Sequence, residues 1–198
     1  CSGRRANMRA EAADATRAFD ALKAIASVEP AGLSDARRRF RREAVALARA
    51  EGLGRAEMTF AVVPLDAPAA ELLRAGGEAF FAPRMLPDSG ELTALAFGVC
   101  TIGPALVEKV RALFAERKMS LALALDTLGN QMLMEASRRL QDRILADVPE
   151  RGLTMAGELR AGDPGLALEA QPAVLRLAGA GRIGVAATRS LALEPAKS

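Results

Sequence analysis

The sequence contains no histidine, tryptophan or tyrosine, and only seven phenylalanines and two cysteines. Without histidine, the chain has no imidazole metal ligand and no Ser-His or Cys-His nucleophile. Few aromatic side chains means few platforms on which single-stranded bases can stack. The two cysteines can form neither a disulfide framework nor a metal cage. The residues therefore offer no imidazole-based nucleophile and no histidine or cysteine metal site.

The sequence also lacks a long apolar run and a large charge excess. No apolar run approaches the ~20 residues that cross a bilayer, and 27 basic residues face 24 acidic ones. The only local cluster of positive charge, at residues 37–42, is typical of a solvated helix face. We expect a cytoplasmic protein that binds neither nucleic acid nor a membrane. One alternative stays open, in which Cys1 is the lipid-bearing residue of a processed lipoprotein.

The first 54 residues predict a helical segment. Alanine-rich residues 11–28 carry apolar side chains at helical spacing, and the sequence around Pro30 interrupts them. Ser34 or Asp35 can cap a second helix that ends at Gly52. We expect these two helices to pair at the N-terminus, ahead of a domain that covers residues 55–198.

Residues 55–198 alternate between strand and helix patterns. Strands are expected at 58–65, 80–81, 92–102 and 182–193, and helices at 67–75, from Pro104 onward, 121–144 and 168–177. A glycine-containing loop covers 157–165. Because the order lacks a regular βαβ rhythm, we predict a single α+β domain. Its twisted, mainly antiparallel sheet would be packed by helices.

The longest predicted helix carries an apolar stripe in steps of three and four residues, which predicts burial along one side. The stripe consists of Leu121, Leu125, Leu128, Met132, Ala136, Leu140 and Ile144. Gly129 lies mid-helix, where it costs roughly 1 kcal/mol relative to alanine. A glycine there suggests that another element or a ligand approaches the backbone closely. Cys100 lies in an apolar stretch and is expected to be a buried, reduced thiol.

Two groups of polar residues are candidates for ligand binding. Asp126, Asn130 and Glu135 lie on or near one helix, where a carboxylate can receive an amine or a ribose, or can simply decorate the surface. In the loop, Arg160 offers a bidentate clamp for a carboxylate, although the loop also fits a tight surface turn. On these residues alone, the chain is an α+β domain without an assigned role.

Several motifs resemble the activation domain of cobalamin-dependent methionine synthase and its free-standing relatives. The resemblance covers roughly residues 55–198, and it is clearest between Thr101 and Ile144. The family's Thr-Ile-Gly turn corresponds to residues 101–103, and its Leu-Asp-x-x-Gly-Ser-like step to residues 125–130. Its Ile-Gly-Val strand corresponds to residues 183–190 and its Pro-x-Lys-Ser tail to residues 195–198.

The resemblance implies binding of S-adenosylmethionine while a partner's corrinoid is reduced. It implies that the following residues contact S-adenosylmethionine: Asp126, Asn130, Glu135, Arg160, Ala161 and Gly165. The implied partners are a corrinoid-binding methyltransferase protein and a flavodoxin-like electron donor. Cobalamin would be reached only through that partner protein, and no residue of this chain would be catalytic.

The sequence departs from the family pattern at ligand positions. The family's tyrosine after Pro-Gly is Leu166 here, and its Thr-Glu-Ser glutamate is Arg189. Exchanging an aromatic ring and a carboxylate for leucine and arginine should weaken binding of a cationic sulfonium. The alternative is therefore a non-catalytic scaffold or docking protein that keeps the fold without binding S-adenosylmethionine. A third reading is a protein unrelated to cobalamin that reuses the fold.

Overall fold

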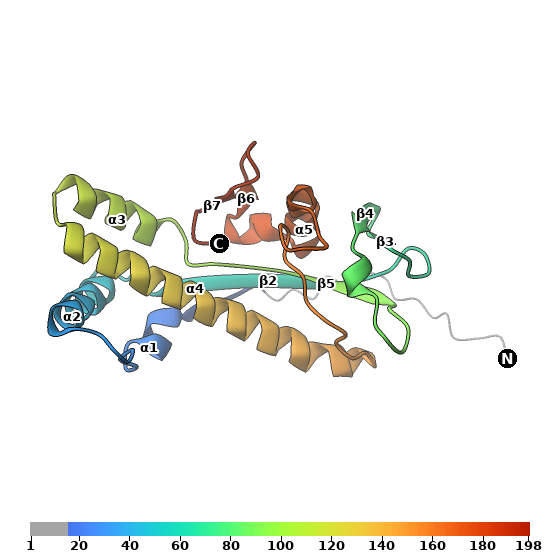
Figure 1. Cartoon of the computed structure of the whole chain (residues 1–198), viewed down its shortest axis with the longest axis horizontal. Helices are drawn as coiled ribbons and strands as arrows, with labels where there is room; N and C mark the ends of the chain where they lie inside the picture. The colour runs from blue at the N-terminus through green and yellow to red at the C-terminus, as the bar shows by residue number, and fades with distance from the viewer. Residues whose placement is uncertain (1–15) are drawn as a thin grey trace.

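The computed structural model describes residues 16–198. A three-stranded antiparallel sheet with the order β1-β2-β5 forms its centre. Strand β2 (Arg55–Pro64) pairs with β5 (Ala94–Thr101) along its length, and β1 (Arg17–Asp20) pairs with the start of β2. The helix α4 (Met119–Asp147) crosses in front of β2 and β5 (Figure 1). These elements confirm the predicted α+β class.

The other helices pack on both sides of the sheet. The helices α1 (Ala21–Ile25), α2 (Asp35–Ala50) and α3 (Ala105–Ala115) share one core with α4. The helix α5 (Gln171–Ala178) packs against β5 in a second core, together with the hairpin of β3 (Leu72–Ala75) and β4 (Glu78–Phe81). Strands β2 and β5 are therefore covered on both faces, which explains why they are apolar almost throughout.

The remaining elements are short. The 3-10 helices are η1 (Pro83–Met85), η2 (Val148–Arg151), η3 (Leu168–Ala170) and η4 (Ala180–Ile183). A two-residue hairpin pairs β6 (Ala186–Ala187) with β7 (Leu193–Glu194). In Figure 1 this hairpin and the C-terminus lie close to α5.

On the face of the sheet that packs against α4, β2 carries large side chains and β5 carries small ones. On the side of α4, β2 contributes the large residues Met58, Phe60 and Val62. Their partners on β5 are Cys100, Gly98 and Ala96, which are all small. A Cβ at Gly98 would lie 3.1 Å from Cδ2 of Leu140. The small residues of β5 therefore allow α4 to approach the sheet closely.

Three local predictions were wrong. Residues 17–20 form strand β1 rather than part of a helix over 11–28, and of the described residues in that range only 21–25 are helical. Residues 72–75 form strand β3 rather than the end of a helix over 67–75. The expected strand over 182–193 is mostly a 3-10 turn and a loop, and strand structure is limited to β6 and the start of β7.

Other predictions are confirmed. Ser34 caps α2 by accepting a hydrogen bond from the Arg37 amide, and the predicted stripe of α4 is buried except for the half-buried Leu121. Cys100 is buried and free. Cys1 lies outside the described residues. The core of α1, α2 and α4 also includes β2, and the boundary at residue 54 stays a prediction.

Candidate functional site

The side chain of Lys197 binds to helix α4 through an ion pair and a hydrogen bond. Its Nζ lies 2.9 Å from Oδ1 of Asp126 and donates a hydrogen bond of 2.5 Å to Oδ1 of Asn130. Asp126 and Asn130 are one helical turn apart, so both side chains leave the same face of α4. Lys197 is only 8% exposed. A buried ammonium requires charged or polar partners, and these two residues provide them.

Thr101 at the end of β5 completes this contact. Its Oγ1 donates to the carbonyl oxygen of Lys197 and accepts hydrogen bonds from the Gly103 amide and from Oγ of Ser198. The Ile102 amide also donates to the Lys197 carbonyl, at 3.1 Å. The hydroxyl of Thr101, a residue that is 1% exposed, therefore uses its one proton and both acceptor positions. We call Thr101, Asp126, Asn130, Lys197 and Ser198 the C-terminal clasp.

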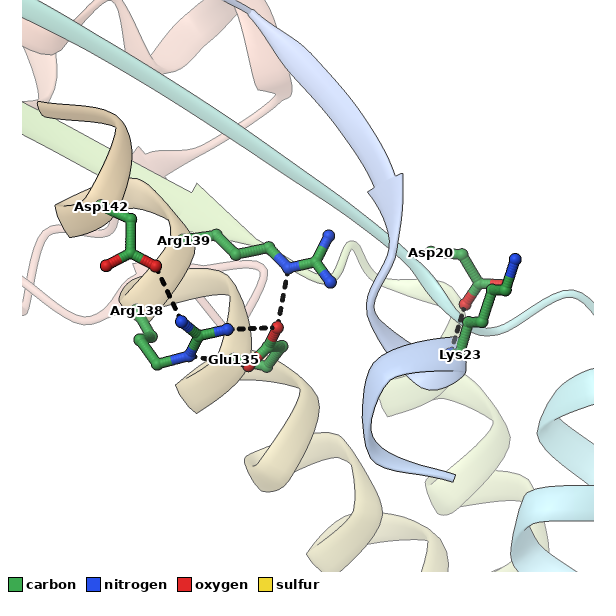
Figure 2. A network of polar contacts seen from close by, with 6 residues as sticks. All are labelled: Asp20, Lys23, Glu135, Arg138, Arg139 and Asp142. Atoms are coloured by element: carbon green, nitrogen blue, oxygen red, sulfur yellow. Dashed lines mark hydrogen bonds and ion pairs between the residues drawn. The ribbon is translucent and has the colours of Figure 1, made fainter. Parts of the chain in front are cut away.

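Glu135 belongs to a different cluster on α4 (Figure 2). Its Oε1 accepts from Nε of Arg139 at 2.7 Å and from Nη2 of Arg138 at 3.0 Å, and its Oε2 accepts from Nε of Arg138 at 3.1 Å. Arg138 also donates to Asp142 at 2.7 Å. The hydrogen bonds from Arg138 lower the pKa of Glu135 against the opposing effect of burial, and Arg139 adds to the lowering. Glu135 is therefore ionised at neutral pH.

The Glu135 cluster faces away from the clasp. The guanidinium of Arg139 lies over the ring of Phe19 on β1, 4.4 Å from its centroid. Glu135 follows Asp126 by nine residues, which is about two and a half turns of a helix. The two carboxylates therefore lie on opposite sides of α4.

The loop around Arg160 is held by hydrogen bonds among its own residues. Oδ2 of Asp163 accepts from the Arg160 amide at 2.9 Å, and the Gly162 amide donates to the Leu166 carbonyl at 2.9 Å. Gly165 has φ +103°, a conformation that L side chains rarely adopt. Together these features fix the loop as a tight, glycine-dependent turn.

Other elements cover part of this loop. Arg84 donates to the Pro164 carbonyl at 3.0 Å, and a Cβ at Gly165 would lie 2.7 Å from Cδ of Arg84. The Arg160 side chain is 66% exposed, with Nε 3.3 Å from Glu158, which in turn accepts from Gln141 of α4. Ala161 is half-buried. The guanidinium of Arg160 is thus an accessible cation of this loop.

The six candidate residues therefore lie in three places. Asp126 and Asn130 are in the clasp, Glu135 is bound by two arginines, and Arg160, Ala161 and Gly165 are in the loop. Two shallow hollows of about 280 and 400 Å³ are lined by other residues. The first lies beside α5, and the second lies between β1 and the end of α2. Neither hollow joins the three places.

Sequence reasoning assigned no role to Lys197 or Thr101, although both lie in motifs of the resemblance. Lys197 is 67 residues from Asn130, so no spacing rule connects them. The one usable signal was Gly129. Its expected close approach is confirmed, because a Cβ there would lie 2.7 Å from Cδ2 of Leu106 and 3.0 Å from Cδ and Cε of Lys197.

The described part of the chain shows no further site of a common type. Between residues 16 and 198, no group of three or more Cys, Asp or Glu side chains is placed to hold a metal ion. Within the same residues, no helix is both long and apolar enough to span a bilayer. No family model matches the sequence, and no curated protein matches it either.

Proposed function

We propose that this protein is an accessory module of a corrinoid-dependent methyltransferase system of the methionine synthase type. It would support reductive reactivation of a partner's cobalamin with S-adenosylmethionine. The observation that carries the proposal is the C-terminal clasp. Three motifs of the resemblance, at residues 101–103, 125–130 and 195–198, contact one another although they are far apart in the sequence.

This contact supports the resemblance because it explains why the three motifs occur together in one sequence. The turn after β5, the polar step on α4 and the Lys-Ser tail need one another to satisfy buried polar groups. A set of unrelated short matches would be scattered over the fold. The functional conclusion rests on the family resemblance that this contact supports.

The group most available for S-adenosylmethionine is Arg160, whose exposed guanidinium can clamp the ligand's carboxylate in a bidentate manner. Glu135 lies in a separate place on α4, so it cannot receive the ammonium group of the same bound amino acid. The corrinoid would supply the redox and methyl-transfer chemistry, and this chain would bind and position the methyl donor. Such a module would act in the cytoplasm beside a corrinoid-binding methyltransferase protein and a flavodoxin-like donor.

A second candidate is a docking protein that keeps the frame and has lost S-adenosylmethionine binding. The pairing of Glu135 with Arg138 and Arg139 favours it, because a ligand ammonium would compete with two internal cations. Leu166 and Arg189, where the family has a tyrosine and a glutamate, favour it as well. Such a protein would contact the same corrinoid partner without a methyl donor.

Calorimetric titration with S-adenosylmethionine tests the proposal. The first candidate predicts micromolar binding that Arg160→Ala weakens at least about tenfold, since a charge-assisted bidentate contact is lost. Arg111→Ala is the matched control, because Arg111 is an exposed arginine on α3. An absence of heat at millimolar ligand would reject the first candidate.

A reactivation assay then tests the corrinoid role shared by both candidates. Methionine synthase lacking its own activation domain is held as cob(II)alamin with reduced flavodoxin, and its return to methylcobalamin is followed by absorbance. The first candidate predicts acceleration only when S-adenosylmethionine and this protein are both present. The docking candidate predicts binding to the corrinoid protein without acceleration. Neither acceleration nor binding would contradict both.

A further inference from the structure

One side of helix α4 carries a row of charged residues that faces strand β1. Glu135, Arg139 and Arg143 follow one another at intervals of four residues, which places them along the same side of the helix. The guanidinium of Arg139 lies 4.4 Å from the centre of the Phe19 ring, and Figure 2 shows Arg139 extending from α4 toward β1. Arg143 therefore leaves α4 on the β1 side, one turn after Arg139.

Arg17 lies on the face of β1 that is turned toward α4. Side chains alternate between the two faces of a strand, so Arg17 shares a face with Phe19, which packs against the core beside α4. The residue paired with Arg17 on β2 is Met58, which belongs to the same core. Both observations place the exposed Arg17 on the α4 side of the sheet.

Helix α4 follows strand β2 in the same direction. Its Asn130 is bound to Lys197, whose carbonyl oxygen accepts from the Ile102 amide just after β5. Further along α4, Leu140 lies beside Gly98, where a Cβ would be 3.1 Å from the leucine Cδ2. Helix α4 thus runs from the end of β5 toward its middle, and β2, which is antiparallel to β5, runs the same way.

Arg17 and Arg143 therefore face each other from β1 and α4. From the contact between Phe19 and Arg139, α4 advances about 6 Å in the four residues to Arg143. Strand β1 is antiparallel to β2, so its two residues back to Arg17 cover about 7 Å in the same direction. The fold brings these two guanidinium groups to one place.

This pair of arginines has no carboxylate partner among residues 16–198. Neither Arg17 nor Arg143 takes part in an ion pair there, and Nε of Arg143 is buried without a hydrogen-bond partner. The carboxylates of the row are bound elsewhere. Glu135 accepts from two other arginines, and Asp147, one turn after Arg143, accepts from Nε of Arg151 at 2.6 Å. A buried donor and two facing like charges cost free energy that a bound anion would offset.

We propose that Arg17 and Arg143 bind a phosphate dianion, either inorganic phosphate or the phosphate group of a small monoester. The planar guanidinium group matches phosphate oxygens in geometry and in charge. Arg139 uses Nε for Glu135, and its Nη groups can serve as further donors. The inference does not depend on the corrinoid role.

The local charge favours a dianion over a carboxylate. Five arginines and three carboxylates lie along this side of α4 and on β1, which leaves two positive charges. They are Arg17, Arg138, Arg139, Arg143 and Arg151, with Glu135, Asp142 and Asp147. A phosphate dianion neutralises both charges, whereas a carboxylate leaves one. Because the site is partly exposed, we expect a Kd of about 0.1–1 mM that increases with added salt.

NMR titration of the arginine Nε–H signals with inorganic phosphate at low ionic strength and about pH 7.5 tests the site. The Arg143 signal, assigned by its loss in Arg143→Met, should shift as phosphate is added. Calorimetry should give a Kd at least about tenfold higher for Arg143→Met and for Arg17→Ala. Arg17 is exposed, so its substitution leaves the core intact.

Arg42→Ala is the matched control, because Arg42 is an exposed arginine on α2. This variant should bind phosphate as the wild type does. Equal weakening by Arg42→Ala and Arg17→Ala would mean that phosphate binds anywhere on a basic surface, and it would overturn the proposal. An Arg143 signal that does not shift at about 20 mM phosphate, well above the expected Kd, would also overturn it.

A series of anions at the same pH separates the possible ligands. Dimethyl phosphate and acetate carry one charge each and should bind at least about tenfold more weakly than inorganic phosphate. Acetate that binds as tightly as phosphate would overturn the proposal. Among the dianions, tighter binding of glycerol 3-phosphate would identify a monoester as the ligand, and equal or weaker binding would identify inorganic phosphate.

Discussion

Lys197 crosses Gly129 so closely that a Cβ at residue 129 would lie 3.0 Å from both Cδ and Cε of the lysine. The glycine gives the alkyl chain of Lys197 a path over α4, and the ammonium then reaches Asp126 and Asn130 beyond it. A helix-weakening residue and a buried charge are therefore parts of one contact. The clasp can be tested at either of the two residues.

Gly129→Ala should destabilise the protein, although alanine normally favours a helix over glycine. The new Cβ would clash with Leu106 at 2.7 Å as well as with Lys197. Overpacking of this kind costs about 1–3 kcal/mol, which lowers Tm by about 2–4 °C per kcal/mol in a protein of this size. Calorimetry measures the shift. Gly157→Ala, at a position with open space, is the control, and an increase in Tm for Gly129→Ala would contradict the close contact.

Removing the charge of Lys197 should loosen the clasp by a modest amount. A double-mutant cycle of Lys197→Met and Asp126→Asn should give a coupling of about 0.5–1 kcal/mol at low salt. The Asp126 side chain is 42% exposed, so added salt should reduce this coupling. Urea unfolding measures each variant. The exposed pair Lys118 and Glu116 serves as the reference, and equal couplings for both pairs would show that burial of Lys197 adds nothing.

Glu135 should make stability depend on pH on the acid side. Its pKa is lower in the folded protein than its usual value near 4.5, chiefly through hydrogen bonds from Arg138. The stabilisation is therefore fully present at neutral pH, begins to fall as the pH drops through the unfolded-state value, and is lost below the folded pKa.

Glu135→Gln isolates this contribution, because glutamine cannot be ionised. At neutral pH the variant should be less stable by about 0.5–1 kcal/mol, the scale of two helical ion pairs. The difference should shrink as the pH falls below the unfolded-state pKa and the wild-type carboxylate is protonated. Urea unfolding at several pH values measures it. A difference that grows as the pH falls would show that the carboxylate does not pair with Arg138 and Arg139.

Cys100 should be almost unreactive in the folded protein. Burial raises the pKa of its thiol to about 11, and the charge of Arg160 only partly offsets this effect. At about pH 8 the thiolate fraction falls roughly a hundredfold from that of a thiol with pKa 9, and burial also blocks the reagent. In a Cys1→Ser background, labelling with a chromogenic disulfide should be slow in buffer and fast in guanidinium. Rapid labelling in buffer would mean that Cys100 is accessible.

The sequence predicted the long periodic elements and missed the short ones. The apolar stripe of α4 and the long strand pair were visible because their patterns repeat over many residues. Strand β1 has only the residues Arg17–Asp20, and it is a strand because β2 offers it a hydrogen-bonded edge. Such pairing depends on residues almost 40 positions away, so no local pattern shows it.

The sequence does contain a signal for the β3–β4 hairpin, the pair of glycines at residues 76 and 77. The predicted helix over residues 67–75 would end at Gly76 and Gly77, yet both glycines have positive φ and join the paired strands Leu72–Ala75 and Glu78–Phe81. Two glycines between apolar runs are typical of a two-residue hairpin turn. At the candidate site, too, local sequence patterns do not predict a contact between residues that are far apart in the chain. Nothing local predicts that Lys197 would meet Asp126, whereas a glycine inside a helix correctly indicated a close neighbour.

The alternation of side chains along β5 has a consequence for how the protein unfolds. Leu95, Phe97 and Val99 belong to the core beside α5, while Ala96 and Cys100 pack in the core beside α4. If either core unfolded alone, one apolar face of β2 and β5 would be exposed to water. Loss of α5 alone would expose an aggregation-prone surface, so both cores should unfold as one cooperative unit. The amide protons of β2 and β5 should exchange only through that global opening.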